Sequence, residues 1–111
     1  MAEAFKKLAQ GRLPASDGTL KLYDVPGSTE GIIKSINLSN NTGTDRIVTL
    51  HHTDNSGTAA DTNLILPGVN IVAGGFAEWE GTMTMAALTE IHGFAAAADA
   101  ISYTIWGIEI S

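Results

Sequence analysis

Cysteine is absent from this chain of 111 residues. Disulfide bonds and thiolate metal sites are therefore excluded, and cysteine usage says nothing about the compartment. No apolar run approaches the roughly 18–20 residues that a membrane-spanning helix needs. The segment Met1–Leu8 also lacks the apolar core of a secretory signal peptide. We therefore expect the protein to fold in a cytoplasm and to have no membrane partner.

Positive charge is scarce and lies towards one end of the chain. The six Lys and Arg residues all fall between Lys6 and Arg46, and the formal net charge is −6. Proteins bind nucleic acid largely by placing Lys and Arg side chains on the phosphate backbone and releasing counterions. Most of this chain has no such side chain to offer, so we expect no nucleic-acid partner.

The chain is rich instead in short segments that alternate apolar and polar residues and end at Gly, Pro or Asn. About eight such segments are typical of an antiparallel β-sandwich or jelly roll, and the length suits one domain. We predict an all-β fold in which residues 17–111 form a single antiparallel β-sandwich, jelly-roll-like in character. Residues 1–16 are predicted to form an N-terminal arm or short helix.

Two of these segments are predicted to form a hairpin. Gly31–Ser39 and Arg46–His52 alternate in polarity and are joined by Asn40–Gly43, whose Asn and Gly residues tolerate the backbone angles of tight turns. Strict alternation along the first strand places Ile33 and Ile36 on opposite faces.

The last predicted strand, Ala100–Ile110, is apolar on both faces. One face carries Trp106, Ile108 and Ile110, and the other carries Ile101, Tyr103 and Ile105. Such a strand lies at the centre of a sheet or has one face covered by another subunit, and both arrangements remain open. We predict a homo-oligomer, a trimer or dimer, whose interface contains Tyr103, Ile105, Trp106 and Ile108.

Residues 1–13 fit two kinds of structure. Small and apolar residues in this segment would share one face of a helix ending at Gly11, but the segment could equally lie extended as an arm or an edge strand. We predict that it binds an acidic partner or a neighbouring subunit through Phe5, Lys6, Lys7, Leu8 and Arg12. The alternative is a solvated surface. Deletion of residues 1–13 is then expected to weaken binding and to leave the rest of the chain folded.

Paired carboxylates are the best candidates for catalysis. Glu78 and Glu80 would share one face of a strand about 6–7 Å apart, which touches the separation of glycosidase carboxylates. The pair precedes Gly81 at a predicted strand end, whereas catalytic acids usually come from different elements. We therefore interpret the pair as a solvated edge, and predict no enzymatic activity and no cofactor.

The histidines and one polar loop supply only fragments of metal sites. His51 and His52 are adjacent and would face opposite ways on a strand, whereas Glu90 and His92 would share a face as half of a site. The loop Asp54–Asp61 lacks the ligand spacing of a calcium-binding EF-hand. We predict no metal site.

Four aromatic residues offer a possible platform for sugar rings: Phe76, Trp79, Tyr103 and Trp106. Large aromatic side chains in a small sandwich more often belong to the core or to a subunit interface. The carbohydrate-binding alternative predicts that Trp79 or Trp106 is exposed.

Four segments of the chain, taken in order, resemble a family of small bacteriophage virion proteins. They are Phe5–Gly11, Thr19–Pro26, Gly31–Asn40 and Tyr103–Ser111. The resemblance implies a non-enzymatic β-sandwich that is built into the particle in many copies. It transfers no functional residues, and the middle of the chain, from His51 to Asn63, lies outside it.

The function that we predict is that of a virion structural protein assembled in the host cytoplasm. The leading hypothesis is a capsid decoration or cement protein that binds the major capsid protein, or other virion proteins, across capsomer boundaries. One alternative is a component of the tail, neck or fibre. The second, from a different class, is a carbohydrate-binding module.

Overall fold

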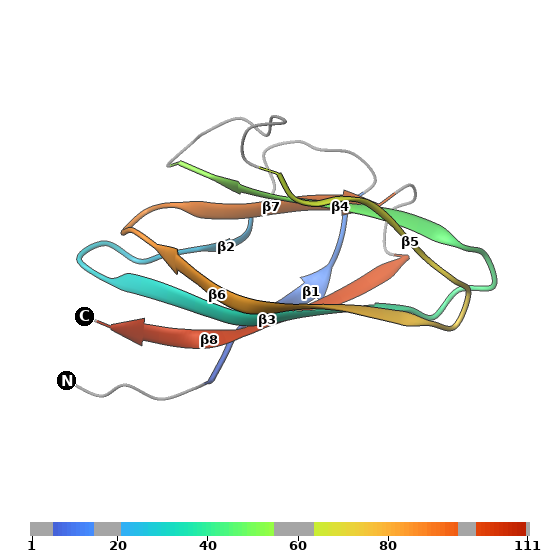
Figure 1. Cartoon of the computed structure of the whole chain (residues 1–111), viewed down its shortest axis with the longest axis horizontal. Coiled ribbons are helices and arrows are strands. Elements are labelled where there is room, and N and C mark those ends of the chain that lie inside the picture. Colours follow the sequence, from blue (N-terminus) through green and yellow to red (C-terminus); the bar gives the residue numbers. More distant parts are fainter. Residues whose placement is uncertain (1–5, 15–20, 55–63, 96–99, 111) are drawn as a thin grey trace.

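The computed structural model describes residues 6–14, 21–54, 64–95 and 100–110 of the chain. They form two layers (Figure 1), each a four-stranded sheet. The strands are β1 (Lys6–Arg12), β2 (Lys21–Asp24), β3 (Glu30–Asn40), β4 (Arg46–Thr53), β5 (Leu64–Ile71), β6 (Phe76–Met85), β7 (Glu90–Ala95) and β8 (Ile101–Ile110). The predicted all-β antiparallel sandwich is confirmed. No helix among the described residues is long and apolar enough to span a membrane.

The order of the strands is that of a jelly roll. One sheet has the order β1-β8-β3-β6 and the other β2-β7-β4-β5, and every pair is antiparallel. Among the described strands only β4 and β5 are neighbours both in sequence and in a sheet, because the chain otherwise crosses between strands that are distant in sequence. This crossing between two packed sheets defines the jelly-roll class of β-sandwich.

The core lies between the two sheets. Fully buried side chains from one sheet meet those of the other: Ile36, Leu38 and Ile105 from the β1-β8-β3-β6 sheet, and Leu50 and Ile91 from the β2-β7-β4-β5 sheet. Burying a Leu or Ile side chain stabilises the fold by about 1.5–3 kcal/mol relative to leaving it exposed. The alternation of apolar residues along each strand is what supplies this layer.

The N-terminal residues 6–12 form an edge strand, one of the arrangements that the sequence left open. β1 pairs with β8 from Lys6 to Arg12, and the next residue, Leu13, is fully buried and donates its backbone N–H to the Ile101 carbonyl at 2.9 Å. Removal of residues 1–13 would delete this strand and a core side chain, so the expectation that the body folds without them stays a prediction that the pairing of β1 disfavours. The expected domain boundary between residues 16 and 17 lies outside the described residues.

The predicted hairpin between residues 31 and 52 is not formed. β3 pairs with β6 and β8 in one sheet, whereas β4 pairs with β5 and β7 in the other. The Asn40 side chain, which is 1% exposed, fixes the crossing. Its Nδ2 donates to the carbonyls of Thr44 and Ile71, both at 2.9 Å, and its Oδ1 accepts from the Thr42 backbone N–H at 3.0 Å. The Asn-rich segment thus makes a corner between sheets.

The strict alternation predicted along β3 is also wrong. The register of β3 shifts between Ile33 and Ser35 against both neighbouring strands. Against β8, the irregularity adds one residue, Lys34, to β3, and a β-bulge of this kind reverses the side-chain alternation beyond it. Ile33 and Ile36 therefore both face the core, and both are fully buried.

Two tyrosine hydroxyls connect the sheets. Tyr103 on β8 donates to the Leu22 carbonyl of β2 at 3.2 Å. In the reverse direction, Tyr23 on β2 donates to Glu109 Oε2 on β8 at 2.6 Å, and Lys6 Nζ on β1 lies 3.2 Å from Glu109 Oε1. One carboxylate thereby holds three strands together. Burial, followed by the hydrogen bond to Glu109 and its charge, raises the pKa of Tyr23 above the ordinary value.

Replacement of Leu13 tests whether β1 is part of the folded body. Leu13→Ala should lower the free energy of unfolding by about 2–5 kcal/mol, since it leaves a cavity in the core. Arg12→Ala, next to it and exposed, is the control and should change stability by less than about 0.5 kcal/mol. Urea denaturation measures both. Equal, small effects would show that β1 behaves as a detachable arm.

The Tyr23 hydrogen bond predicts loss of stability at high pH. Because the pKa of Tyr23 in the folded state lies above its ordinary value of 10.0, the unfolded chain loses this proton first as pH rises past that value. Stability should therefore fall with rising pH above 10, and Tyr23→Phe should make this fall shallower. Denaturation at a series of alkaline pH values measures the slope. Identical slopes for the two proteins would contradict the assignment.

Candidate subunit-binding surface

The pairing of β1 with β8 brings the two ends of the described chain onto one sheet. Lys7 is the register partner of Trp106, and Arg12 is the register partner of Ser102. Residues predicted separately as a basic docking segment and as an apolar interface strand therefore lie side by side. The sequence could not show this, because the two segments are almost the whole chain apart.

The predicted interface residues on β8 divide between its two faces. Tyr103 is 7% exposed and Ile105 is fully buried, because both point into the chain's own core. Their side chains are taken up within the sandwich and are not available to a second subunit. Trp106 and Ile108 are only partly buried and point outward. An interface formed by these two residues stays a prediction.

The predicted docking residues on β1 divide in the same way. Leu8 packs against the core, and Lys6 forms its ion pair with Glu109 on the core side of the sheet. Lys7 and Arg12 are exposed and point outward. Phe5 lies outside the described residues. Lys7 and Arg12 are therefore the members of this set whose side chains lie on the outward side of the sheet, and docking through them stays a prediction.

The outward side chains of all four strands form a surface that we call the outer sheet face. Three register rows cross it from β1 through β8 and β3 to β6. The rows are Lys7–Trp106–Ser35–Glu80, Gln10–Thr104–Asn37–Glu78 and Arg12–Ser102–Ser39–Phe76. A fourth row lacks β1 and consists of Ile108–Ile32–Thr84.

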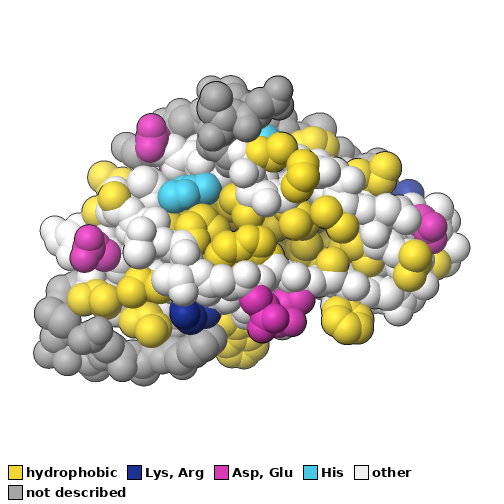
Figure 2. Space-filling model, viewed as in Figure 1, with side chains coloured by type: hydrophobic (Ala, Val, Ile, Leu, Met, Phe, Trp, Pro, Cys, Tyr) yellow, Lys and Arg dark blue, Asp and Glu magenta, His cyan; other side chains and the backbone are white. Residues whose placement is uncertain are grey.

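Charge on the outer sheet face is separated by strand. The edge strand β1 contributes Lys7 and Arg12, and the opposite edge strand β6 contributes Glu78 and Glu80. Strands lie about 4.8 Å apart, so the two edges are about 14 Å from each other. Within the described part of the chain, none of these four residues forms an ion pair. Figure 2 shows acidic side chains on its lower side, where β6 runs in Figure 1.

The interior of the outer sheet face is less charged than its edges. Lys34, at the bulge in β3, extends to β6, where its Nζ donates to Thr82 Oγ1 at 2.8 Å. On the edge strand β1, Lys7 Nζ donates a hydrogen bond to Gln10 Oε1 at 3.0 Å. Between the edges lie the apolar side chains of Trp106, Ile108 and Ile32. An apolar centre with a polar rim is the usual composition of a protein–protein interface.

A second apolar region lies at the open edge of the sandwich between β5 and β6. Hydrophobic side chains gather in the middle of the view in Figure 2, between the positions of these strands in Figure 1. The partly buried residues that pack against the core there are Ile65, Leu66, Ala77, Trp79 and Met83. They cover the core along this edge.

The four aromatic residues of the carbohydrate-binding alternative do not form one platform. Trp79 faces the core from β6, as Tyr103 does from β8. Trp106 and Phe76 both point outward, but β3 separates their strands and they lie two register rows apart. Phe76 is 80% exposed. These four residues therefore provide no continuous surface on which a sugar could stack.

The carboxylate pair on β6 is exposed, as interpreted from the sequence. Glu78 and Glu80 both point away from the core into solvent. An exposed position on a strand lacks the enclosed, apolar surroundings in which a catalytic acid usually lies. Their arrangement suits recognition of positive charge.

The pair of Glu90 and His92, which the sequence offered as half of a metal site, is buried and contributes to the fold. Glu90 and His92 are 1% and 4% exposed, and His92 Nε2 lies 2.8 Å from Glu90 Oε1. Lys21 Nζ approaches the other Glu90 oxygen at 3.6 Å, which connects β2 to β7. The described residues contain no cluster of three His, Asp or Glu side chains suited to a metal ion. Of the predicted polar loop, only Asp54 is described, and it is exposed.

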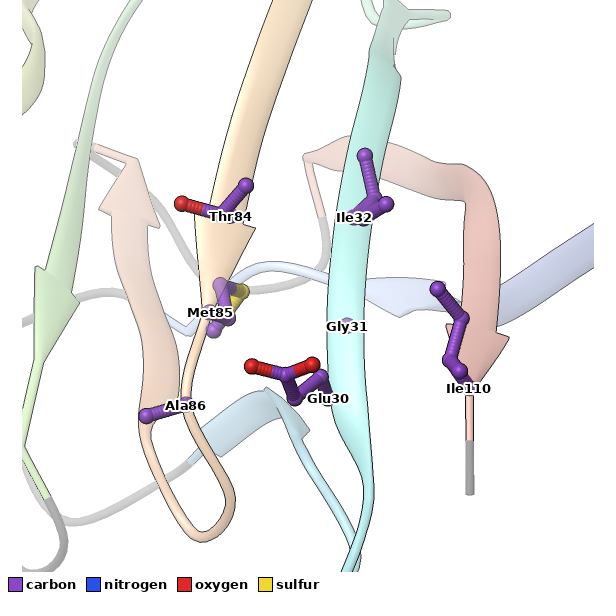
Figure 3. Close-up of a pocket in the computed structure, with 7 residues that line it drawn as sticks. All are labelled: Glu30, Gly31, Ile32, Thr84, Met85, Ala86 and Ile110. Carbon is purple, nitrogen blue, oxygen red and sulfur yellow. The ribbon is translucent and has the colours of Figure 1, made fainter.

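A pocket of about 360 Å³ lies where β3 begins and where β6 and β8 end (Figure 3). Its surface is divided almost evenly between polar and apolar atoms, and the Glu30 carboxylate and the Thr84 hydroxyl are its polar side-chain groups. The residues that line it are Glu30, Gly31, Ile32, Thr84, Met85, Ala86 and Ile110. A single exposed carboxylate beside apolar side chains can bind a ligand but supplies no acid–base pair for catalysis.

The strand order and this surface define the chain as a jelly-roll β-sandwich with a polarised outer sheet face. No protein-family model matches the sequence, and no curated protein matches it in sequence. Solved structures do match the fold. One is a chain in the structure of infectious bursal disease virus, Gx strain, at a TM-score of 0.54 and 12% identity. The likeness covers 97% of this chain and 32% of that one.

A second match is a chain in the crystal structure of the T13 particle of the same virus. Its TM-score is 0.53 at 10% identity, over 98% of this chain and 31% of that chain. The present chain thus spans about a third of the length of both viral chains. At these identities the likeness shows a shared fold over nearly the whole of this chain.

Proposed function

We propose that this chain is a non-enzymatic structural protein of a virus particle. The observation that carries the proposal is the jelly roll itself, which aligns over nearly the whole chain with chains in infectious bursal disease virus particles. The outer sheet face supports it, because a flat surface with an apolar centre and charged edges is suited to joining subunits.

The proposed particle is that of a bacteriophage, and the proposed place of the protein is the outside of the capsid. The ordered sequence segments that resemble small bacteriophage virion proteins favour a phage particle. Within that particle, decoration or cementing of the capsid is the role proposed. A protein bound across capsomer boundaries adds contact area, and burial of roughly 1,600 Å² suffices for a stable contact. Because it binds only the assembled lattice, it stabilises that lattice by linkage.

The residues proposed to make these contacts lie on β1 and β8. Lys7 and Arg12 would meet acidic groups of a neighbouring virion subunit, which is either the major capsid protein or another copy of this chain. Trp106 and Ile108 would supply the apolar contact beside them. Phe5, which lies outside the described residues, stays a predicted member of this docking set. Lys6 contributes indirectly, since its ion pair with Glu109 fixes β1 in the sheet.

Co-sedimentation with isolated phage heads and isolated tails tests the proposal. The purified protein should sediment with heads at high copy number, and the Lys7→Glu/Arg12→Glu variant should bind at least about tenfold more weakly, because it reverses the charges that face the partner. The Asp54→Lys variant, changed at the exposed residue that follows β4 of the other sheet, is the control and should bind like the wild type.

Other outcomes separate the alternatives. Binding to tails alone would contradict decoration and favour a tail, neck or fibre component. Binding to neither would contradict a virion role. In that case a glycan panel, read by tryptophan fluorescence, would test the carbohydrate-binding alternative.

A further inference from the structure

The outer sheet face is complementary to itself. It carries positive charge on one edge strand, β1, and negative charge on the opposite edge strand, β6. Between them lie the apolar residues of β8 and β3, together with two charged residues of β3: Glu30 at its start and Lys34 at its bulge, whose ammonium group extends to Thr82 on β6. A surface with opposite charges on its two edges can bind a second copy of itself if the copy is turned so that unlike edges meet. Two turns of the copy have to be compared.

We propose that the outer sheet face binds a second copy of this chain about a two-fold axis that runs parallel to the strands, between β8 and β3. This inference rests on the subunit-binding role proposed above for the outer sheet face. It adds that the subunit bound there is a second copy of this chain. Rotation about this axis places β1 of each copy over β6 of the other and β8 over β3.

The register rows then bring complementary side chains together. Lys7 of one copy lies over the row position of Glu80 of the second copy, and Gln10 lies over that of Glu78. Arg12 lies over the position of Phe76, whose 80% exposed ring offers a face for a cation–π contact. Each contact occurs twice, because the interface is two-fold symmetric.

The apolar centre is matched by the same rotation. Ile108 on β8 and Ile32 on β3 are register partners in one copy. When β8 lies over β3 of the second copy, Ile108 faces Ile32 across the interface, and the reverse contact forms on the other side of the axis. Trp106 lies over the smaller Ser35, which leaves room for the indole ring. The row without charges therefore forms the apolar part of the interface.

The other two-fold axis that would stack these faces is disfavoured. An axis perpendicular to the strands places β1 over β1 and β6 over β6. Lys7 and Arg12 would then meet the same cations of the second copy, and Glu78 and Glu80 would meet carboxylates. Like charges placed together across an interface are strongly unfavourable. The charge pattern thus selects one arrangement of the dimer.

The area available is sufficient for a stable dimer. The four strands, of seven to eleven residues each, span a flat area of roughly 600 Å² at ordinary strand spacing and rise per residue. Because side chains project from the sheet, the accessible area of the face is larger than this flat area. It approaches the area of about 800 Å² per partner that is typical of stable interfaces. Two sheets that pack face to face keep their strands within about 30° of each other, so the row contacts persist with small lateral shifts.

Sedimentation equilibrium of the purified chain without particles tests this dimer. The wild type should be a dimer. Lys7→Glu/Arg12→Glu and Glu78→Lys/Glu80→Lys should each raise the dissociation constant at least about tenfold, because each places like charges together. The variant that carries all four changes should bind at least about threefold more tightly than either two-change variant, since it restores unlike charges between positions 7 and 80 in the reverse sense, whereas the contact of Arg12 with Phe76 stays lost.

The four-change variant separates the two axes. With β1 stacked on β1, reversal of all four charges leaves like charges facing each other, so no recovery would occur. Failure of recovery would overturn the proposed axis. A wild type that stays monomeric, or that forms a trimer or larger ring, would overturn the dimer itself.

A pair of isoleucine variants tests whether the face, and not only its edges, is buried. Ile108→Lys should abolish the dimer. Ile47→Lys is the matched control, since Ile47 is 53% exposed on the other sheet, and it should leave the dissociation constant within about threefold of the wild type. Equal effects of the two variants would overturn the proposal. Neither measurement depends on particle binding, so failure of the dimer and failure of the virion role are separate results.

Discussion

Backbone pairing of β8 with both β1 and β3 is the constraint on which the rest of the structure depends. Because β8 is central in its sheet, its side chains alternate between the core and the outer sheet face. Ile105 and Tyr103 close the core, and the Tyr103 hydroxyl reaches across to β2. The same pairing directs Trp106 and Ile108 outward and places the basic strand β1 beside them. Stability and the proposed binding surface thus come from one strand.

The jelly-roll order converts a bias in the sequence into a polarised surface. All Lys and Arg residues precede residue 47, but this fact alone does not say where positive charge lies on the molecule. The order β1-β8-β3-β6 places the basic strand and the acidic strand at opposite edges of one sheet. An edge strand carrying charged side chains also resists uncontrolled pairing with other chains. The separated charges therefore favour a specific contact over aggregation.

The sequence predicted the fold class because alternating apolar residues dominate it, as in Ile101–Ile110. It failed where a local irregularity outweighed the pattern. The bulge at Lys34 puts Ile33 on the side of Ile36, and strict alternation contains no sign of such a shift. Asn40 was expected in a hairpin, yet its buried side chain fixes a crossing between sheets. The outer sheet face could not be predicted, because it depends on pairings between residues far apart in the sequence, such as Lys7 with Trp106, which are 99 positions apart.

The central claim is that this jelly roll is a virion subunit that uses its outer sheet face to contact a neighbouring subunit. A cryo-EM reconstruction of particles that carry the protein tests it most directly. The account predicts jelly-roll density at many equivalent positions, with the β1-β8-β3-β6 sheet covered by a neighbouring subunit. Particles without this density, or a jelly roll whose outer sheet face is open to solvent at every position, would contradict it.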